Sequence, residues 1–143
     1  MNAAKLVTEL GTELGISLSL GETGTCRVYF DDDVVDFEQS GDSLYIMAEI
    51  APAYGMEDAY ARLLTANWLG AESGGACIGL DANRDAFALY AVFHGDVPYE
   101  NFEERLILFI RALRYWKDWL SSSVLSNSDN SAVDTNTLGM LKV

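Results

Sequence analysis

Five short apolar stretches constrain this chain most strongly, because three of them follow one another with only a few turn residues between. The first three are residues 26–30, 34–39 and 44–50, and two more follow at 76–80 and 86–93. Stretches of this length with apolar residues at alternate positions are typical of strands that bury one face. Because such short connections join strands that lie side by side, the sequence predicts an antiparallel meander for the first three.

The third stretch separates its two faces most clearly. One face consists of Leu44, Ile46, Ala48 and Ile50. The other carries Tyr45 and Met47 beside Glu49. Tyr29 of the first stretch joins this second face, which is more apolar than a solvated surface needs to be. We therefore expect it to be either a binding surface or a surface that the last helix or the C-terminal tail covers.

Three helical patterns complete the order of elements. They cover residues 3–15, 56–69 and 99–120, each with apolar residues three or four positions apart. The order helix, three strands, helix, two strands, helix predicts an α/β fold, more strictly α+β, with the element sequence α-β-β-β-α-β-β-α. In such a fold a twisted, mainly antiparallel sheet packs against helices.

The middle helix is apolar over a wider arc than one sheet face requires. Tyr60 and Trp68 lie about 80° apart around a helix axis and straddle Leu64. A second copy of the chain would bury this extra width, since symmetric dimers are the commonest oligomers. The alternative is a helix that packs deep inside a monomer.

Composition places these elements in one domain. Half of the 143 residues are hydrophobic, so the chain can bury a core without disulfides or metal. After Leu120 the composition changes to Ser, Asn, Asp and Thr. We expect residues 1–120 to form the domain and residues 121–143 to form a flexible Ser/Asn-rich C-terminal tail.

The charge of the chain limits its partners. Nine Lys and Arg against 22 Asp and Glu give a formal net charge of −13. Nucleic-acid binding depends on Lys and Arg to neutralise phosphates, so we expect no nucleic-acid partner. No apolar run is long enough to span a bilayer, and the first residues lack the apolar core of a secretory signal, so we expect no membrane insertion.

The residues that most often carry chemistry form no recognisable site. His94 is the single histidine, and Cys26 and Cys77 stand apart from any metal-binding spacing. Two cysteines allow one disulfide, but no feature of the sequence requires it. A small enzyme that uses His94 and Cys77 is an alternative, and it requires the two side chains to meet in the fold.

Two further motifs are better explained as turns. Residues 31–33 are three consecutive aspartates between strands, without the spacing, glycine and flanking helices of a calcium loop. Gly74 and Gly75 precede a strand and lack the Lys and Ser/Thr of a phosphate-binding loop. The sequence thus predicts no catalytic residue, no cofactor and no metal.

Several segments taken together resemble a known family. They are Cys26-Arg-Val-Tyr-Phe-Asp-Asp-Asp-Val-Val after the first helix, Leu63-Leu-Thr-Ala-Asn-Trp-Leu, Ser73-Gly-Gly-Ala-Cys-Ile-Gly-Leu-Asp81, and Ala86-Phe-Ala-Leu-Tyr-Ala-Val. In this order, and with this length and acidity, the chain resembles the type III secretion effector chaperones of the Tir chaperone (CesT/SycE) family. The resemblance covers about residues 3–120.

The resemblance implies a homodimeric chaperone of the bacterial cytoplasm without ATPase activity. Such a protein binds the N-terminal chaperone-binding segment of a cognate effector in extended form and keeps it soluble and secretion-competent. It then helps to deliver the effector to the secretion apparatus, with the secretion ATPase as a further partner. A non-secretory adaptor or regulatory protein of the same fold is an alternative function.

The resemblance also implies two sets of contact residues. The dimer interface corresponds to Tyr60, Leu63, Leu64, Asn67, Trp68, Ala76, Ile78 and Leu80. Effector contacts correspond to Leu10, Leu14, Leu18, Tyr29, Tyr45 and Met47.

Overall fold

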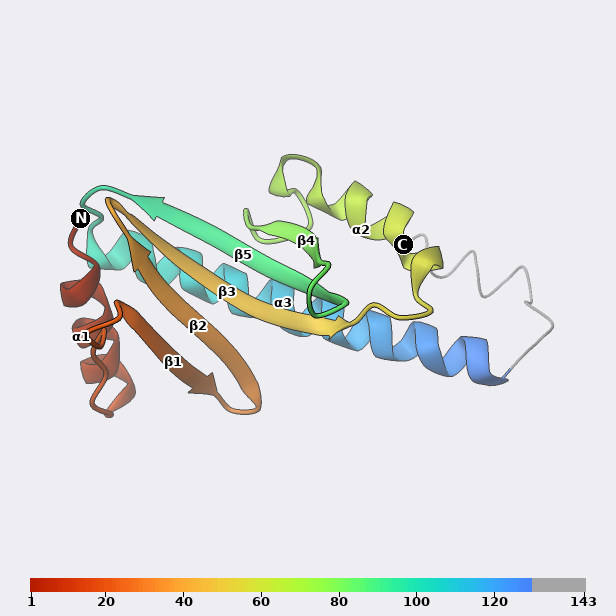
Figure 1. The fold of residues 1–143 in the computed structure, drawn as a ribbon, viewed down its shortest axis with the longest axis horizontal. Coiled ribbons are helices and arrows are strands. Elements are labelled where there is room, and N and C mark those ends of the chain that lie inside the picture. The colour runs from red at the N-terminus through yellow and green to blue at the C-terminus, as the bar shows by residue number, and fades with distance from the viewer. Residues whose placement is uncertain (130–143) are drawn as a thin grey trace.

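The computed structural model describes residues 1–129, with side chains described as far as residue 123. Its elements, coloured along the chain in Figure 1, are α1 (Ala3–Leu14), β1 (Thr25–Phe30), β2 (Asp33–Ser40), β3 (Ser43–Pro52), α2 (Tyr60–Asn67), β4 (Cys77–Asp81), β5 (Ala86–His94) and α3 (Tyr99–Asp129). Single-turn 3-10 helices flank α2 at Glu57–Ala59 and Trp68–Gly70. This order confirms the predicted α+β fold.

The five strands form one antiparallel sheet in the order β1-β2-β3-β5-β4. The predicted meander is therefore β1-β2-β3, and the hairpin of β5 and β4 adds to its far side. α3 runs along the sheet on one face (Figure 1). Within residues 1–129, no helical segment has the length and apolar character that a bilayer span requires.

All three helices contribute to one core on a single face of the sheet. The predicted inner face of β3 is buried, with Leu44 and Ile46 fully enclosed. The apolar stripe of α3 packs on this face, and its buried members are Phe102, Leu106, Phe109, Leu113, Trp116 and Leu120. Each such side chain contributes about 1.5–3 kcal/mol on burial. None of the helices within residues 1–129 lies on the opposite face of the sheet, so α3 does not cover Tyr45 and Met47.

α2 is shorter than the helix predicted over residues 56–69. It begins at Tyr60, and it ends at Asn67 because Trp68 has a ψ of 116°. Leu69 then takes a left-handed φ of 57°, which turns the chain away from the helix axis. β3 also differs in that it runs through Pro52 instead of ending before it, because an irregularity between Glu49 and Ala51 brings Pro52 opposite Ala86.

α3 is longer than predicted, since it continues past Leu120 to Asp129. Ser122 and Ser123 fit this longer helix because their hydroxyls donate to the carbonyls of Asp118 and Trp119, one turn back. The rest of the predicted tail, residues 130–143, lies outside the described residues.

Candidate binding surfaces

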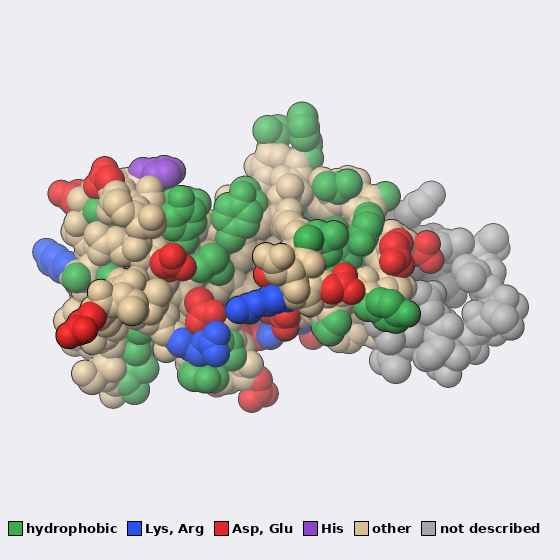
Figure 2. All heavy atoms as spheres, in the orientation of Figure 1, with side chains coloured by type: hydrophobic (Ala, Val, Ile, Leu, Met, Phe, Trp, Pro, Cys, Tyr) green, Lys and Arg blue, Asp and Glu red, His purple; other side chains and the backbone are tan. Residues whose placement is uncertain are grey.

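Exposed apolar side chains gather where α2 faces β4. Leu64 is 67% exposed, Trp68 73%, Leu69 86% and Leu80 48%. We name these four residues the α2–β4 surface. Hydrophobic side chains protrude from the molecule near the end of α2 (Figure 2). Side chains of this size are normally buried. A group of them exposed on one side of the molecule therefore marks a contact surface.

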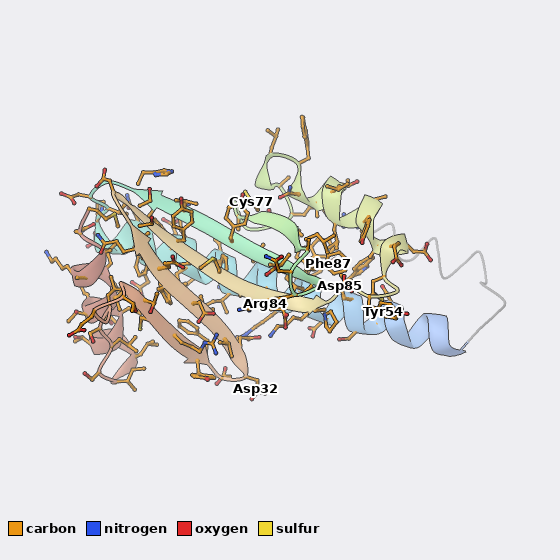
Figure 3. All side chains as sticks on the ribbon, in the orientation of Figure 1. Asp32, Tyr54, Cys77, Arg84, Asp85 and Phe87 are labelled. Carbon is orange, nitrogen blue, oxygen red and sulfur yellow. The ribbon has the colours of Figure 1, made fainter. Side chains whose placement is uncertain are left out.

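A small apolar pocket lies within this surface. It has a volume of about 140 Å³ and is lined by Tyr60, Leu63, Leu64, Ile78, Gly79, Leu80 and Phe87. Phe87, labelled in Figure 3, lies on β5 and packs edge-on against Tyr60 at 5.8 Å between ring centres. None of the described side chains that line the pocket is charged. The pocket can therefore accept an apolar side chain without removing a charge from water.

The structure divides the predicted dimer residues into three groups. Leu64, Trp68 and Leu80 are exposed. Leu63, Ala76 and Ile78 are buried in the chain's own core. Tyr60 and Asn67 are half-buried.

Asn67 has an internal role that sequence reasoning missed. Its side-chain Oδ1 accepts a hydrogen bond of 2.8 Å from the backbone N–H of Ile78, which ties the end of α2 to β4. Leu69 was also missed, because we expected it inside the helix. The neighbouring Gly70, which favours a left-handed turn, is the signal that could have found it.

A second surface is the groove between α1, β1 and α3. Its volume is about 500 Å³, and its lining residues are Leu14, Ile16, Tyr29, Phe30, Asp31, Ile107, Ile110, Arg111 and Arg114. We name it the α1–β1–α3 groove. Four of its large apolar side chains are 42–65% exposed, namely Leu14, Ile16, Tyr29 and Ile107. The groove thus offers apolar walls together with two arginines.

The close return of the chain onto α1 places Ile16 in this groove. A side chain at Gly11 would lie 2.8 Å from the carbonyl oxygen of Ile16 and 2.9 Å from the amide nitrogen of Leu18. Only glycine allows this approach. Ile16 then lines the groove, whereas Leu18 packs partly on the core. Ile16 and Ile107 were not among the predicted contacts.

One buried carboxylate fixes the end of the groove where β1 turns into β2. Asp33 accepts hydrogen bonds from Arg114 Nε at 2.7 Å and from Lys117 Nζ at 2.9 Å. Burial on its own raises the pKa of Asp33, but the bonds from Arg114 and Lys117 outweigh it, so the pKa lies below its ordinary value. Arg114 also reaches Asp31 at 3.2 Å. These ion pairs hold the β1–β2 turn against α3.

The predicted effector contacts fall in separate places. Leu14 and Tyr29 line the α1–β1–α3 groove. Leu18 is half-buried beside α1. Leu10 is only 4% exposed, so it is not the surface residue that we expected. It is buried because it shares the inner face of α1 with Leu6 and Val7, which pack in the core.

Tyr45 and Met47 lie on the face of the sheet opposite α1, α2 and α3, which we name the open face. Pairing across β3 and β5 sets Met47 opposite Tyr90 and Tyr45 opposite Val92. A shallow hollow of about 280 Å³ includes Met47 and Tyr90, with Arg84 and Asp81 from the β4–β5 hairpin at its rim. Hydrophobic side chains lie among charged ones on this face (Figure 2).

The residues of the enzymatic alternative do not meet. Cys77 of β4 pairs with Tyr90 of β5, and His94 lies four residues farther along β5, about 13 Å at the usual rise of a strand. His94 Nδ1 instead makes a hydrogen bond of 2.8 Å with Ser43 Oγ. Cys26 and Cys77 are free thiols on the two opposite edge strands, so no disulfide joins them.

Comparison with solved structures shows where this fold occurs. The chain is similar to a chain of the ExsC-ExsE complex, with a TM-score of 0.70 and 22% identity over 82% of this chain and 92% of that one. It is also similar to the Yersinia pestis type III secretion chaperone SycH, solved with a fragment of YscM2. Here the TM-score is 0.64 and the identity 21%, over 80% of this chain and 98% of that one. A chain of the HopA1-SchA chaperone-effector complex has a TM-score of 0.68 and 15% identity, over 80% of this chain and 91% of that one.

Sequence comparison gives the family. No curated protein sequence matches the chain. The pattern of the Tir chaperone protein (CesT) family, however, matches residues 5–117, which span α1 to most of α3. This match confirms the resemblance found in the sequence. The chain therefore belongs to the Tir chaperone protein (CesT) family.

Proposed function

We propose that this protein is a homodimeric type III secretion chaperone of the bacterial cytoplasm, which binds the extended N-terminal segment of a secreted effector. The observation that carries the proposal is the exposure of large apolar side chains on separate surfaces of one chain. One surface serves the dimer, and the others hold the effector. The bound effector stays soluble and secretion-competent until the chaperone delivers it to the secretion apparatus and its ATPase.

The α2–β4 surface supports dimerisation through its shape. Trp68 and Leu69 project from the end of α2, while the apolar pocket lies a short distance away on the same surface. In a two-fold arrangement, the projecting side chains of each copy can fill the pocket of the other. The left-handed φ of Leu69 costs about 1 kcal/mol or more, and burial of its side chain in a dimer offsets that cost.

The dimer is tested by charging this surface. Leu64→Glu places a carboxylate beside the pocket, so we expect a monomer in sedimentation where the wild type is a dimer. Tyr54→Glu is the matched control, because Tyr54 is 87% exposed and lies outside the α2–β4 surface (Figure 3). A Leu64→Glu protein that remains dimeric would show that the copies join elsewhere.

The groove and the open face support peptide binding without chemistry. Both present apolar side chains that an extended segment can cover at alternate positions. Affinity arises from the buried apolar area, at about 25 cal/mol per Å² before ordering costs are subtracted. No catalytic step is part of the proposal, since His94 and Cys77 lie apart on the sheet.

The experiment for effector binding is affinity capture from the native cytosol with three forms of the protein. We expect the wild type to retain one dominant secreted protein by its N-terminal region, with about two chaperone chains per effector. Tyr45→Glu with Met47→Glu tests the open face, and Leu14→Glu with Tyr29→Glu tests the groove. If a double variant stays a folded dimer and captures as much effector as the wild type, the surface that it changes does not bind the effector.

A further inference from the structure

We propose that the α1–β1–α3 groove selects an effector segment that carries an acidic side chain between its apolar residues, and that Arg111 is the partner of that acid. The inference rests on the proposed effector-binding function and defines the chemistry of one part of the site. The net charge of −13 favours basic ligands for the chain as a whole, whereas the proposed groove favours an acidic one.

Arg111 is the first observation, because it lacks any partner within the described residues. It lines the groove and is exposed, yet it makes no ion pair or hydrogen bond there. Its neighbours one turn away on α3 are Ile107, Leu108, Arg114 and Tyr115. None is acidic, so α3 itself offers no carboxylate at the spacing that forms helical ion pairs.

The local charge balance is the second observation. Asp31 and Asp33 at this end of the groove are already engaged by Arg114 and Lys117. Among the residues that line the groove, the two cations Arg111 and Arg114 face one carboxylate, Asp31, which leaves one positive charge in excess. An excess of positive charge beside apolar walls is unusual in a chain with 22 acidic residues and nine basic ones.

The groove's shape makes a peptide the occupant. Leu14, Ile16 and Ile107 expose apolar surface on both sides of the groove, which suits alternate apolar side chains of an extended segment. A guanidinium binds a carboxylate through two parallel hydrogen bonds, and partial removal of water strengthens them. An acid that follows an apolar anchor would thus reach Arg111 while its neighbours cover the walls.

Binding of synthetic peptides to the full-length protein tests the inference. The probes are fluorescein-labelled peptides that alternate Leu and Ser and carry Asp, Asn or Lys at one central position, measured by fluorescence anisotropy. We expect the wild type to bind the Asp peptide about fivefold more tightly than the Asn peptide. Arg111→Gln should abolish this preference, and Arg111→Glu should make the Lys peptide the tightest.

Lys5→Gln is the matched control. Lys5 is also exposed and without an ion pair in the described residues, but it does not line the groove. The Lys5→Gln protein should keep the full preference for Asp. The inference is wrong if no peptide binds the wild type, if the wild type prefers Lys, or if Arg111→Gln still prefers Asp. In these cases effector capture by the wild type, and its loss in the groove variant, would still support the proposed function.

Discussion

Asp33 is the one buried charged side chain in the described part of the chain, at 8% exposure. Its carboxylate joins the β1–β2 turn to α3 through Arg114 and Lys117, so a single residue connects the sheet edge to the helix layer. Its neighbours Asp31 and Asp32 are exposed. The run of three aspartates is thus a turn in which Asp33 is buried against two cations, while Asp31 makes an exposed ion pair with Arg114.

Asp33→Asn should destabilise the protein at pH 7 by about 1–3 kcal/mol, because two cations lose their shared acceptor. The folded pKa of Asp33 lies below the ordinary 3.8, so its contribution is complete above that pH and is lost as the pH falls below it. Urea unfolding at pH 7 and at about pH 3 should therefore show the largest difference from the wild type at pH 7. Asp32→Asn, at the tip of the same turn (Figure 3), should change neither value.

Gly74 sets how closely the loop after α2 approaches α3. A Cβ there would lie 2.5 Å from the carbonyl oxygen of Leu108, and the residue has a φ of 64°. Gly74→Ala should therefore lower the free energy of unfolding by about 2–4 kcal/mol. Gly75→Ala is the control, since Gly75 has a φ of 77° but open space around it. Equal losses in the two variants would mean that backbone strain alone, and not the contact with α3, explains the effect.

Sequence patterns predicted single residues well only where one face of an element is buried. The alternation in β3 placed Leu44 and Ile46 inward, as the structure has them. On α2 the helical spacing could not separate Leu63 from Leu64, because adjacent residues both fall on a wide apolar arc. In the folded chain Leu63 is buried in the core, whereas Leu64 is exposed.

At the scale of elements, the order along the chain was predictable, whereas the ends of the helices were not. Short turns and alternating residues define the strands locally. The end of α2 depends on the left-handed Leu69, and the end of α3 on whether a serine-rich stretch prolongs an existing helix. Neither depends on the apolar pattern from which we predicted the boundaries. The groove was unpredictable because α3, which supplies one of its walls, is distant in sequence from α1 and β1.

The C-terminal part of α3 offers a test of where the domain ends. Leu120 is the last buried side chain that the structure describes, and we predict the domain boundary there. Removal of residues 124–143 should therefore change the free energy of unfolding by less than about 0.5 kcal/mol. Leu120→Ala should cost about 2–5 kcal/mol in the same urea titration. A large loss on truncation would show that the domain extends beyond the predicted boundary at residue 120.

At the scale of the whole molecule, charge opposes the proposed dimer. Two chains of −13 repel each other, and the described residues that line the pocket on the α2–β4 surface carry no charge that could compensate. Salt shortens the range of this repulsion from about 30 Å at 0.01 M to about 8 Å at 0.15 M. We expect the dimer Kd, measured by sedimentation, to fall by about threefold to tenfold over that range. A dimer that weakens with salt would instead indicate ion pairs across the interface.

The contacts that fix the walls of the α1–β1–α3 groove also affect how a bound effector is released. Asp33 fastens one end, and the tight passage at Gly11 fixes the chain after α1. Because these walls are shaped before any peptide arrives, the entropy lost on loading falls on the peptide alone. Under the proposed function, release then requires only that the effector segment dissociate from the groove. The chaperone can bind a further effector afterwards without refolding and without hydrolysing a nucleotide itself.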